Sequence, residues 1–151
     1  TNIALNDVII TRAGFSRLVE LKIYVNGELL SIYNADGIIV STPTGSTGYS
    51  LSAGGPIIFP QTDVMVITPI CPHSLQARSL VVSGEDRIMI EIGRRRKTQR
   101  EEAMVTFDGR SAQELETGDR IEIYKAQETT QLIRLKGRSF YQVLQNKIGT
   151  A

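Results

Sequence analysis

The sequence has 151 residues, of which 41% are hydrophobic and 22% charged, so it is long enough and apolar enough to bury a core. Lys and Arg number 17 and Asp and Glu 16, which leaves a formal charge of +1. That balance argues against a nucleic-acid binder, because such a protein carries a basic surplus. The single cysteine, Cys71, excludes an intramolecular disulfide and a thiolate metal cage.

No apolar run reaches the roughly 20 residues of a membrane helix, and no signal peptide is present. We therefore expect no membrane partner and a cytoplasmic location. The chain begins at Thr1 without Met and enters the apolar stretch 8–10, which looks like a strand, within a few residues. This start indicates a piece of a longer protein whose upstream part is missing.

A period of two dominates the chain. In residues 18–25, apolar side chains at every second position, 19, 21, 23 and 25, alternate with mostly long side chains. This pattern predicts a strand with one face fully buried. Asn26-Gly27 then predicts a hairpin turn into a strand over 28–33, because both turn residues tolerate positive φ. Short apolar runs predict seven further strands, over 37–41, 63–68, 80–83, 87–92, 103–108, 120–125 and 131–134. This pattern predicts a mainly β fold, a two-layer β-sandwich of antiparallel sheets.

Two stretches predict helices. Residues 46–53 predict a short helix after the Thr/Ser-rich loop, with Ser46 or Thr47 as N-cap and Gly54-Gly55 as the stop. Residues 139–148 predict a C-terminal helix that Ser139 caps and Gly149 ends. Its apolar stripe at helical spacing predicts core packing and consists of Phe140, Val143, Leu144 and Ile148.

The run 42–50, Thr-Pro-Thr-Gly-Ser-Thr-Gly-Tyr-Ser, is the strongest candidate for chemistry. Its first six residues bring four Thr or Ser hydroxyls to a predicted helix start, where free backbone N–H groups favour an anionic or polyol ligand. It is not a Walker loop, because Ser46 follows Gly45 where that motif has Lys. On chemistry alone an equal alternative stays open: the Ser and Thr side chains satisfy the loop's own backbone.

The order of motifs resembles the NAD kinase family. Asp36-Gly37, a strand and then TPTGSTGYSLSAGGP are similar to its signature, which usually reads TPTGSTAYSLSAGGP. Asn6-Asp7 resembles the family's upstream Asn-acid motif, whose acid is usually Glu. The segments 68–73 and 107–109 also look like family segments in the expected order. The resemblance runs from Ala4 to Ile148.

The resemblance implies a role for each matching residue. Asn6 and Asp7 would bind the adenosine end of NAD, and Asp36 its nicotinamide side. The residues that would line the dinucleotide pocket are Thr44, Thr47, Gly48, Tyr49 and Ser52, with Gly48 standing where the family usually has Ala. Two further candidates are His73, which the family context places near an NAD site of a neighbouring subunit, and Asp108, whose step into Gly109 also fits a simple tight turn.

The resemblance also implies the setting. The chain would be the C-terminal NAD-binding domain, residues 1–151, of a two-domain kinase that makes NADP from NAD with ATP or polyphosphate and a divalent metal such as Mg. The family's Gly-Gly-Asp-Gly-Thr motif and its general base belong to an upstream α/β domain. We therefore assign no catalytic or metal-binding residue to this chain and expect it to be inactive alone. The 139–148 helix would pack on that upstream domain, and the protein would be a homodimer or homotetramer.

Two alternatives stay open at this point. The first is a lipid kinase of the diacylglycerol type, and the second is a non-enzymatic β-sandwich binding module. The basic run Arg94–Lys97, with Arg100, predicts a solvated hairpin tip rather than a nucleic-acid surface, with phosphate steering as a less favoured role.

Overall fold

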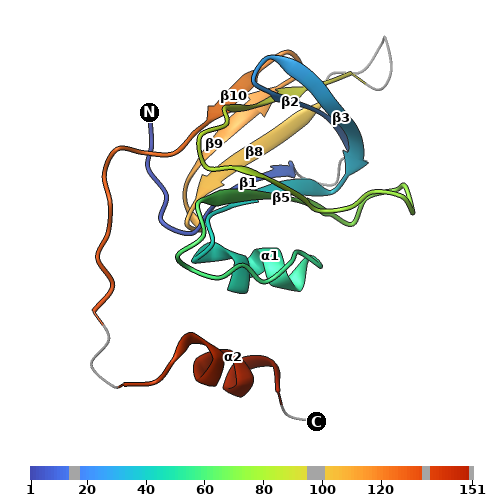
Figure 1. Cartoon of the computed structure of the whole chain (residues 1–151). Coiled ribbons are helices and arrows are strands. Elements are labelled where there is room, and N and C mark those ends of the chain that lie inside the picture. Colours follow the sequence, from blue (N-terminus) through green and yellow to red (C-terminus); the bar gives the residue numbers. More distant parts are fainter. Residues whose placement is uncertain (14–17, 95–100, 134–136, 150–151) are drawn as a thin grey trace.

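The computed structural model describes residues 1–13, 18–94, 101–133 and 137–149. In these ranges ten strands form two antiparallel sheets that face each other (Figure 1). The six-stranded sheet has the order β6-β5-β4-β1-β8-β9, and the four-stranded sheet has the order β10-β7-β2-β3. The predicted two-layer β-sandwich is therefore confirmed.

The strands of the six-stranded sheet are β1 (Asp7–Arg12), β4 (Gly37–Ser41), β5 (Val64–Ile70), β6 (Leu80–Ser83), β8 (Glu102–Phe107) and β9 (Arg110–Glu116). Those of the four-stranded sheet are β2 (Val19–Val25), β3 (Glu28–Ala35), β7 (Ile88–Ile92) and β10 (Arg120–Ile123).

The main core lies between the sheets. Alternate residues of β2 and β7 point inward, which is why their apolar positions repeat every second residue. The six-stranded sheet meets them with Ile10 of β1 and with Ile38 and Val40 of β4. Burying each of these side chains stabilises the fold by about 1.5–3 kcal/mol.

The strands β1 and β4 are buried on both faces. Ile9 and Ile39 point away from the sandwich and form a second small core with Ile70 and the partly buried Ala53, which follows α1 (Tyr49–Ser52). The short helix thus covers the outer face of the six-stranded sheet (Figure 1). This double burial explains why β4 is an unbroken apolar run instead of an alternating one.

Two hairpin turns have glycine at their second position. Asn26 and Gly27 join β2 to β3 with φ of 51° and 84°, as the Asn-Gly pair predicts. Asp108 and Gly109 join β8 to β9 with φ of 49° and 70°. Both turns belong to the type that matches the twist of the strands they connect.

The structure contains one strand that was not predicted, and it lacks one strand that was. The edge strand β9 carries mostly polar, exposed side chains, so it lacks the apolar alternation by which the other strands are recognised. Residues 131–133 form no strand; they are exposed and irregular, and Arg134 lies outside the described residues. The apolar pair Leu132-Ile133 has no sheet to join in this part of the fold.

The C-terminal helix α2 (Phe140–Ile148) has the predicted caps but not the predicted burial. Ser139 and Gln142 form a capping box, and Gly149 is the C-cap. No residue of α2 is buried, so its apolar stripe does not join the core of this chain. The helix lies beyond α1 in Figure 1, and its ring contacts join Phe140 and Tyr141 to Phe59 at 5.3 and 5.8 Å between centroids.

Candidate functional site

The Thr/Ser-rich run forms two short helical turns instead of the single predicted helix. The 3₁₀ turn η1 (Gly45–Thr47) comes first, and Gly48, with φ −93° and ψ −131°, separates it from α1. The prediction that Ser46 or Thr47 caps the helix is wrong, because the N-cap positions are Thr44 and Gly48 and neither helix has a side-chain cap. The chain stops being helical before Gly54, whose φ is +90°.

Three hydroxyls of the run are used inside the protein. The Thr42 Oγ1 accepts a hydrogen bond from the Gly45 N–H. The Ser46 hydroxyl donates to the Pro43 carbonyl and accepts from the Ile58 N–H at 3.0 Å. The Ser50 hydroxyl is buried against Thr68 of β5, with 3.1 Å between their oxygens. These side chains satisfy the protein's own polar groups, as the alternative reading of the run expects.

The other hydroxyls of the run, and that of Ser52 just after it, are outward in the sense that they lack strong internal hydrogen bonds. Tyr49 is 46% exposed and Ser52 is exposed, while Thr44 is half-buried. None of these three makes a side-chain hydrogen bond to any described residue. Thr47 reaches only the Thr44 carbonyl, at 3.5 Å, so its hydroxyl is weakly held. All four are among the residues that the resemblance assigns to the dinucleotide pocket.

The start of the Thr/Ser-rich run contacts the backbone of the Asn6-Asp7 motif. The Thr42 N–H donates to the Asn6 carbonyl at 2.9 Å, and the Thr42 hydroxyl donates to the Leu5 carbonyl at 2.7 Å. Gly45 rests directly on the Asn6 backbone, where a Cβ would overlap the Asn6 carbonyl. The structure therefore brings together two motifs whose contacting residues, Asn6 and Thr42, are 36 residues apart in sequence.

Asp108 holds the same segment from the other side. Its carboxylate accepts hydrogen bonds from the backbone N–H groups of Leu5, Asn6 and Asp7 at 2.7, 2.7 and 3.1 Å. The N–H groups of residues 5–7 are thus held by the β8–β9 turn, while the Leu5 and Asn6 carbonyls accept from Thr42. The Asn6 side chain stays exposed, while the Asp7 side chain is buried at 8% exposure.

The two carboxyl groups have opposite pKa shifts. Burial raises the pKa of Asp7 above its ordinary value, and the nearby charge of Asp108 raises it further. Burial works against the charge of Asp108 too, but its three backbone donors and Arg110 together hold the pKa of Asp108 below its ordinary value. Asp108 is therefore the carboxylate that stays charged most readily.

Asp36 lies at the opposite end of β4. The strand separates it from Thr42 by roughly 20 Å, at about 3.4 Å per residue. The Asp36 carboxylate accepts from the Arg12 guanidinium at 3.0 Å. His73 lies near this end, because its N–H donates to the Asn34 carbonyl while the Asp36 N–H donates to Ile70. Within one chain, the structure does not bring Asp36 and His73 together with Asn6-Asp7.

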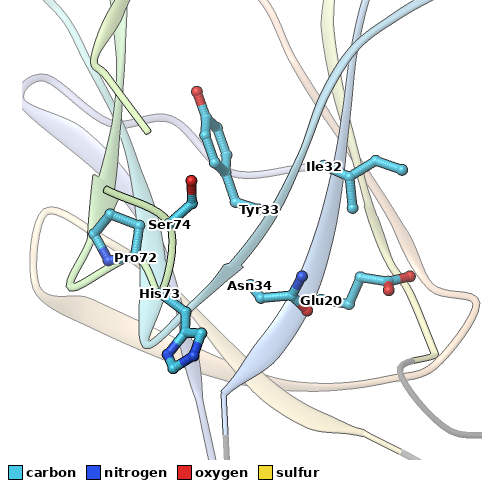
Figure 2. A pocket seen from close by; sticks show the side chains of 7 residues that line it. All are labelled: Glu20, Ile32, Tyr33, Asn34, Pro72, His73 and Ser74. Atoms are coloured by element: carbon cyan, nitrogen blue, oxygen red, sulfur yellow. The ribbon is translucent and has the colours of Figure 1, made fainter. Parts of the chain in front are cut away.

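A pocket of about 370 Å³ lies at this second end (Figure 2). His73 lies on one side of it, on the loop after β5, and the residues of β2 and β3 lie on the other. The Asn34 Oδ1 is buried without a hydrogen-bond partner in the described part of the chain, which is the kind of polar atom a ligand can satisfy. The lining consists of Glu20, Ile32, Tyr33, Asn34, Pro72, His73 and Ser74.

Several contacts of the candidate site carry no signal in the sequence alone. Arg12 pairs with Asp36 only because β1 lies antiparallel beside β4. Thr42 and Asp108 act on the backbone of residues 5–7, and such contacts depend on strand neighbours that a pattern of residue types does not reveal. Of the basic run Arg94–Lys97, only Arg94 is described; it is exposed, and the other residues lie outside the described ranges.

Neither described helix has the length and apolar character that a bilayer-spanning segment requires. The described residues also contain no group of three or more His, Cys, Asp or Glu side chains placed to hold a metal ion. Fold and candidate site together define a mainly β domain in which a Thr/Ser-rich loop packs on the backbone of an Asn-acid pair.

Comparison with known proteins gives the family. The family model for the ATP-NAD kinase C-terminal domain matches residues 5–135, and the chain belongs to this family. It is 55% identical to the NAD kinase of Lachnoclostridium phytofermentans over 146 residues, and 48% identical to that of Caldanaerobacter subterraneus subsp. tengcongensis over 145. These matches cover 97% and 96% of the chain but 51% and 50% of the relatives, so the chain spans about half their length.

Two solved structures have the same fold. A yeast NADH kinase complexed with NADH is 40% identical, with a TM-score of 0.73, over 80% of this chain and 34% of that one. An NAD kinase from Archaeoglobus fulgidus in complex with ATP is 30% identical, with a TM-score of 0.72, over 82% of this chain and 46% of that one. The family predicted from the motifs is confirmed, and neither a lipid kinase nor a non-enzymatic module is favoured.

Gly45→Ala tests the contact between the two motifs. The added Cβ would overlap the Asn6 backbone, so the run must move away from residues 5–7. We expect a loss of about 1–3 kcal/mol, as for overpacked cores, measured as a lower midpoint in urea. Gly48→Ala is the matched control, since its Cβ meets only the Gly45 carbonyl oxygen, at 3.2 Å. Equal effects of the two substitutions would contradict the contact.

Asp7→Asn tests how much the buried charge of the Asp7 carboxylate destabilises the folded state. A raised pKa means that the folded state binds the Asp7 proton more tightly than the unfolded state, so stability is lost as pH rises through the folded pKa. We expect the variant to be more stable than the wild type at pH 7. The gain shrinks on acidification and vanishes below the ordinary value of 3.8. Each kcal/mol relieved raises Tm by about 2–4 °C. A variant that is less stable at pH 7 contradicts this account.

Proposed function

We propose that this chain is the NAD-binding domain of an NAD kinase, which transfers a phosphoryl group to the 2′-hydroxyl of the adenosine ribose of NAD. The 2′-oxygen forms a bond to the terminal phosphorus of ATP or polyphosphate. The bond to the leaving ADP or shortened polyphosphate breaks, and the products include NADP. We place the enzyme in the cytoplasm.

The observation that carries this proposal is the division of the hydroxyls. Residues 42, 46 and 50 make internal hydrogen bonds that organise the loop, whereas Thr44, Tyr49 and Ser52 keep side chains without such bonds, on a loop whose start contacts Asn6. A loop that served only its own backbone would have no reason to leave this set free. The NADH bound to the yeast relative supports a dinucleotide as the ligand.

Each accessible group fits a part of the dinucleotide. The Asn6 side chain carries both donors and an acceptor, as recognition of an adenine edge requires. The small exposed part of the Asp7 carboxylate can accept from ribose hydroxyls, as acidic residues do in other dinucleotide sites. Tyr49 offers a ring for stacking, and Thr44, Thr47 and Ser52 offer hydroxyl donors near the backbone of Gly48.

The general base and the donor site are proposed to lie in an upstream domain. The described residues offer no metal-binding cluster, so we propose that a divalent ion such as Mg arrives with the phosphates of ATP, and we assign no step through it to this chain. What these residues contribute is positioning of the acceptor, which dominates phosphoryl transfer. We expect the domain to be inactive alone.

We propose that the exposed apolar residues of α2 pack against that upstream domain. Tyr141, Val143 and Ile148 are 68%, 43% and 54% exposed, which leaves a helix with an unusually open apolar side. Both ends of the helix are capped by residues of this chain, Ser139 with Gln142 and Gly149. Slower amide exchange along α2 in the two-domain protein than in this domain checks the packing.

We further propose a homodimer or homotetramer whose sites are shared. Asp36 and His73 lie far from Asn6-Asp7 within one chain, at the other end of β4. A neighbouring subunit could bring its own Asp36 end to the nicotinamide side of an NAD held by Asn6-Asp7. In a dimer with two-fold symmetry, the Asp36 end of each subunit would meet the Asn6-Asp7 end of the other, so two equivalent sites would form.

Tyr49→Ala in the two-domain kinase tests the site. Loss of stacking worth about 1–3 kcal/mol should raise the KM for NAD by about 5- to 150-fold, with little change in the KM for ATP. Tyr124→Ala is the matched control, because Tyr124 is 49% exposed, against 46% for Tyr49, and lies beside Arg87, not beside the run. Tyr49→Phe separates the ring from the hydroxyl.

Binding and activity measurements on the wild-type two-domain protein test which class of kinase it belongs to. Saturable NAD binding by calorimetry together with NADP formation is the expected result. If the two-domain protein binds neither NAD nor NADP, or phosphorylates diacylglycerol instead, the proposed function is wrong. If Tyr49→Ala lowers only thermal stability, the function stands but Tyr49 does not line the pocket.

Co-expression of Asp7→Ala and Asp36→Ala chains tests the shared site. Each variant alone should be severely impaired because every site lacks one of the two groups. In a mixed dimer one site receives both intact groups, so about a quarter of the wild-type activity should return. Size-exclusion chromatography of differently tagged chains verifies that mixed oligomers form. Mixed oligomers without recovered activity would show that each site is built from a single chain.

A further inference from the structure

Asp108 is placed to act on the Asn6-Asp7 motif through the backbone. It is the first residue of the β8–β9 turn, with φ of 49°, and its N–H donates to the Asp7 carbonyl at 3.0 Å. This pairing continues the β1–β8 ladder by one step beyond Val8 and Phe107. The Asp108 carboxylate also accepts hydrogen bonds from the backbone N–H groups of residues 5, 6 and 7.

The Asp108 carboxylate is already occupied by these donors. Its Oδ1 accepts from Asn6 and Asp7, and its Oδ2 accepts from Leu5, at distances of 2.7–3.1 Å. Charge-assisted bonds of this length are about twice as strong as neutral ones. A ligand that bound Asp108 directly would have to compete with the backbone of residues 5–7, which makes direct contact the less favourable use of this group.

The segment has no regular partner for these N–H groups. Residues 5 and 6 precede β1, so no strand ladder satisfies their donors. Thr42 fixes only the carbonyl side of the segment. Without Asp108 the N–H side of Leu5 and Asn6 would be held by solvent alone, and the direction of the exposed Asn6 side chain would be less well determined.

We propose that Asp108 is a positioning residue for the acceptor substrate: it sets the backbone of Leu5–Asp7 so that Asn6 and Asp7 meet the adenosine end of NAD. This inference rests on the proposed function and adds to it a residue that acts without touching the substrate. The low pKa of Asp108 supports it, because the carboxylate remains an acceptor throughout the working pH range.

Asp108→Asn in the two-domain kinase is the test. Asn tolerates the positive φ of the turn, so the hairpin is kept. The side-chain amide turns one acceptor into a donor that faces an N–H group and removes the charge. We expect the amides of Leu5, Asn6 and Asp7 to exchange faster in the absence of NAD. The KM for NAD should rise by about 10- to 100-fold, with the KM for ATP changed less than about twofold.

Asp119→Asn is the matched control. The Asp119 Oδ2 accepts from the Glu116 N–H at 2.8 Å in the turn between β9 and β10, so the substitution removes the same kind of bond from another hairpin. It should lower thermal stability to a similar degree and leave the KM for NAD unchanged. A parallel rise in KM in this control would mean that any loosened turn impairs the enzyme, which overturns a specific role for Asp108.

The remaining outcomes separate the inference from the function on which it rests. A wild-type protein that does not bind NAD defeats the proposed function, whereas the amide exchange of residues 5–7 still reports on the backbone contact. Faster exchange with an unchanged KM overturns the positioning role. A raised KM with unchanged exchange shows that Asp108 contacts NAD directly, which overturns it equally.

Discussion

The antiparallel pairing of β1 with β4 at the centre of the six-stranded sheet is the constraint on which the site depends. Its register places Asp7 opposite Ser41 and Thr11 opposite Gly37. Both strands are buried on both faces, and a one-residue slip would exchange the two cores. Gly37 also packs so closely on the Ile10 carbonyl that a Cβ would overlap it. The register is therefore strongly specified.

This register determines which functional residues can meet. Because the two strands run in opposite directions, the start of β1 lies beside the end of β4, where the Thr/Ser-rich run begins. The same pairing places Arg12, at the end of β1, beside Asp36. One strand pair thus creates two separate polar ends, and a ligand that uses both would need either to span the strand or to meet a second subunit.

The Thr/Ser-rich run divides its side chains between support and access. Ser46 and Ser50 anchor the loop and helix to the body, and Gly45 permits the close approach to Asn6. The outward residues are held in place by these inward ones. The buried Asp7 carboxylate lies in an environment that disfavours its charge, as its raised pKa indicates.

The strands, the Asn-Gly hairpin and the caps of α2 could be predicted because they depend on local chemistry: period-two alternation, tolerance of positive φ, and a Ser that accepts from a nearby N–H. The edge strand β9 could not, because its polar face carries no alternation. The helix cap predicted at Ser46 or Thr47 failed because both hydroxyls bond elsewhere. Ser46 bonds the local Pro43 carbonyl and the more distant Ile58 N–H, and Thr47 reaches the Thr44 carbonyl.

The sequence by itself determined the family and the residue types of the site, because the ordered motifs are long and specific. Only the tertiary structure decided which hydroxyls face outward, that Asp36 pairs with Arg12, and that Asp108 holds the backbone of residues 5–7. These facts follow from strand order and register, which bring together groups up to 103 residues apart. A linear pattern carries the chemistry of each residue, but its neighbours in space are set by how the sheets bury their faces.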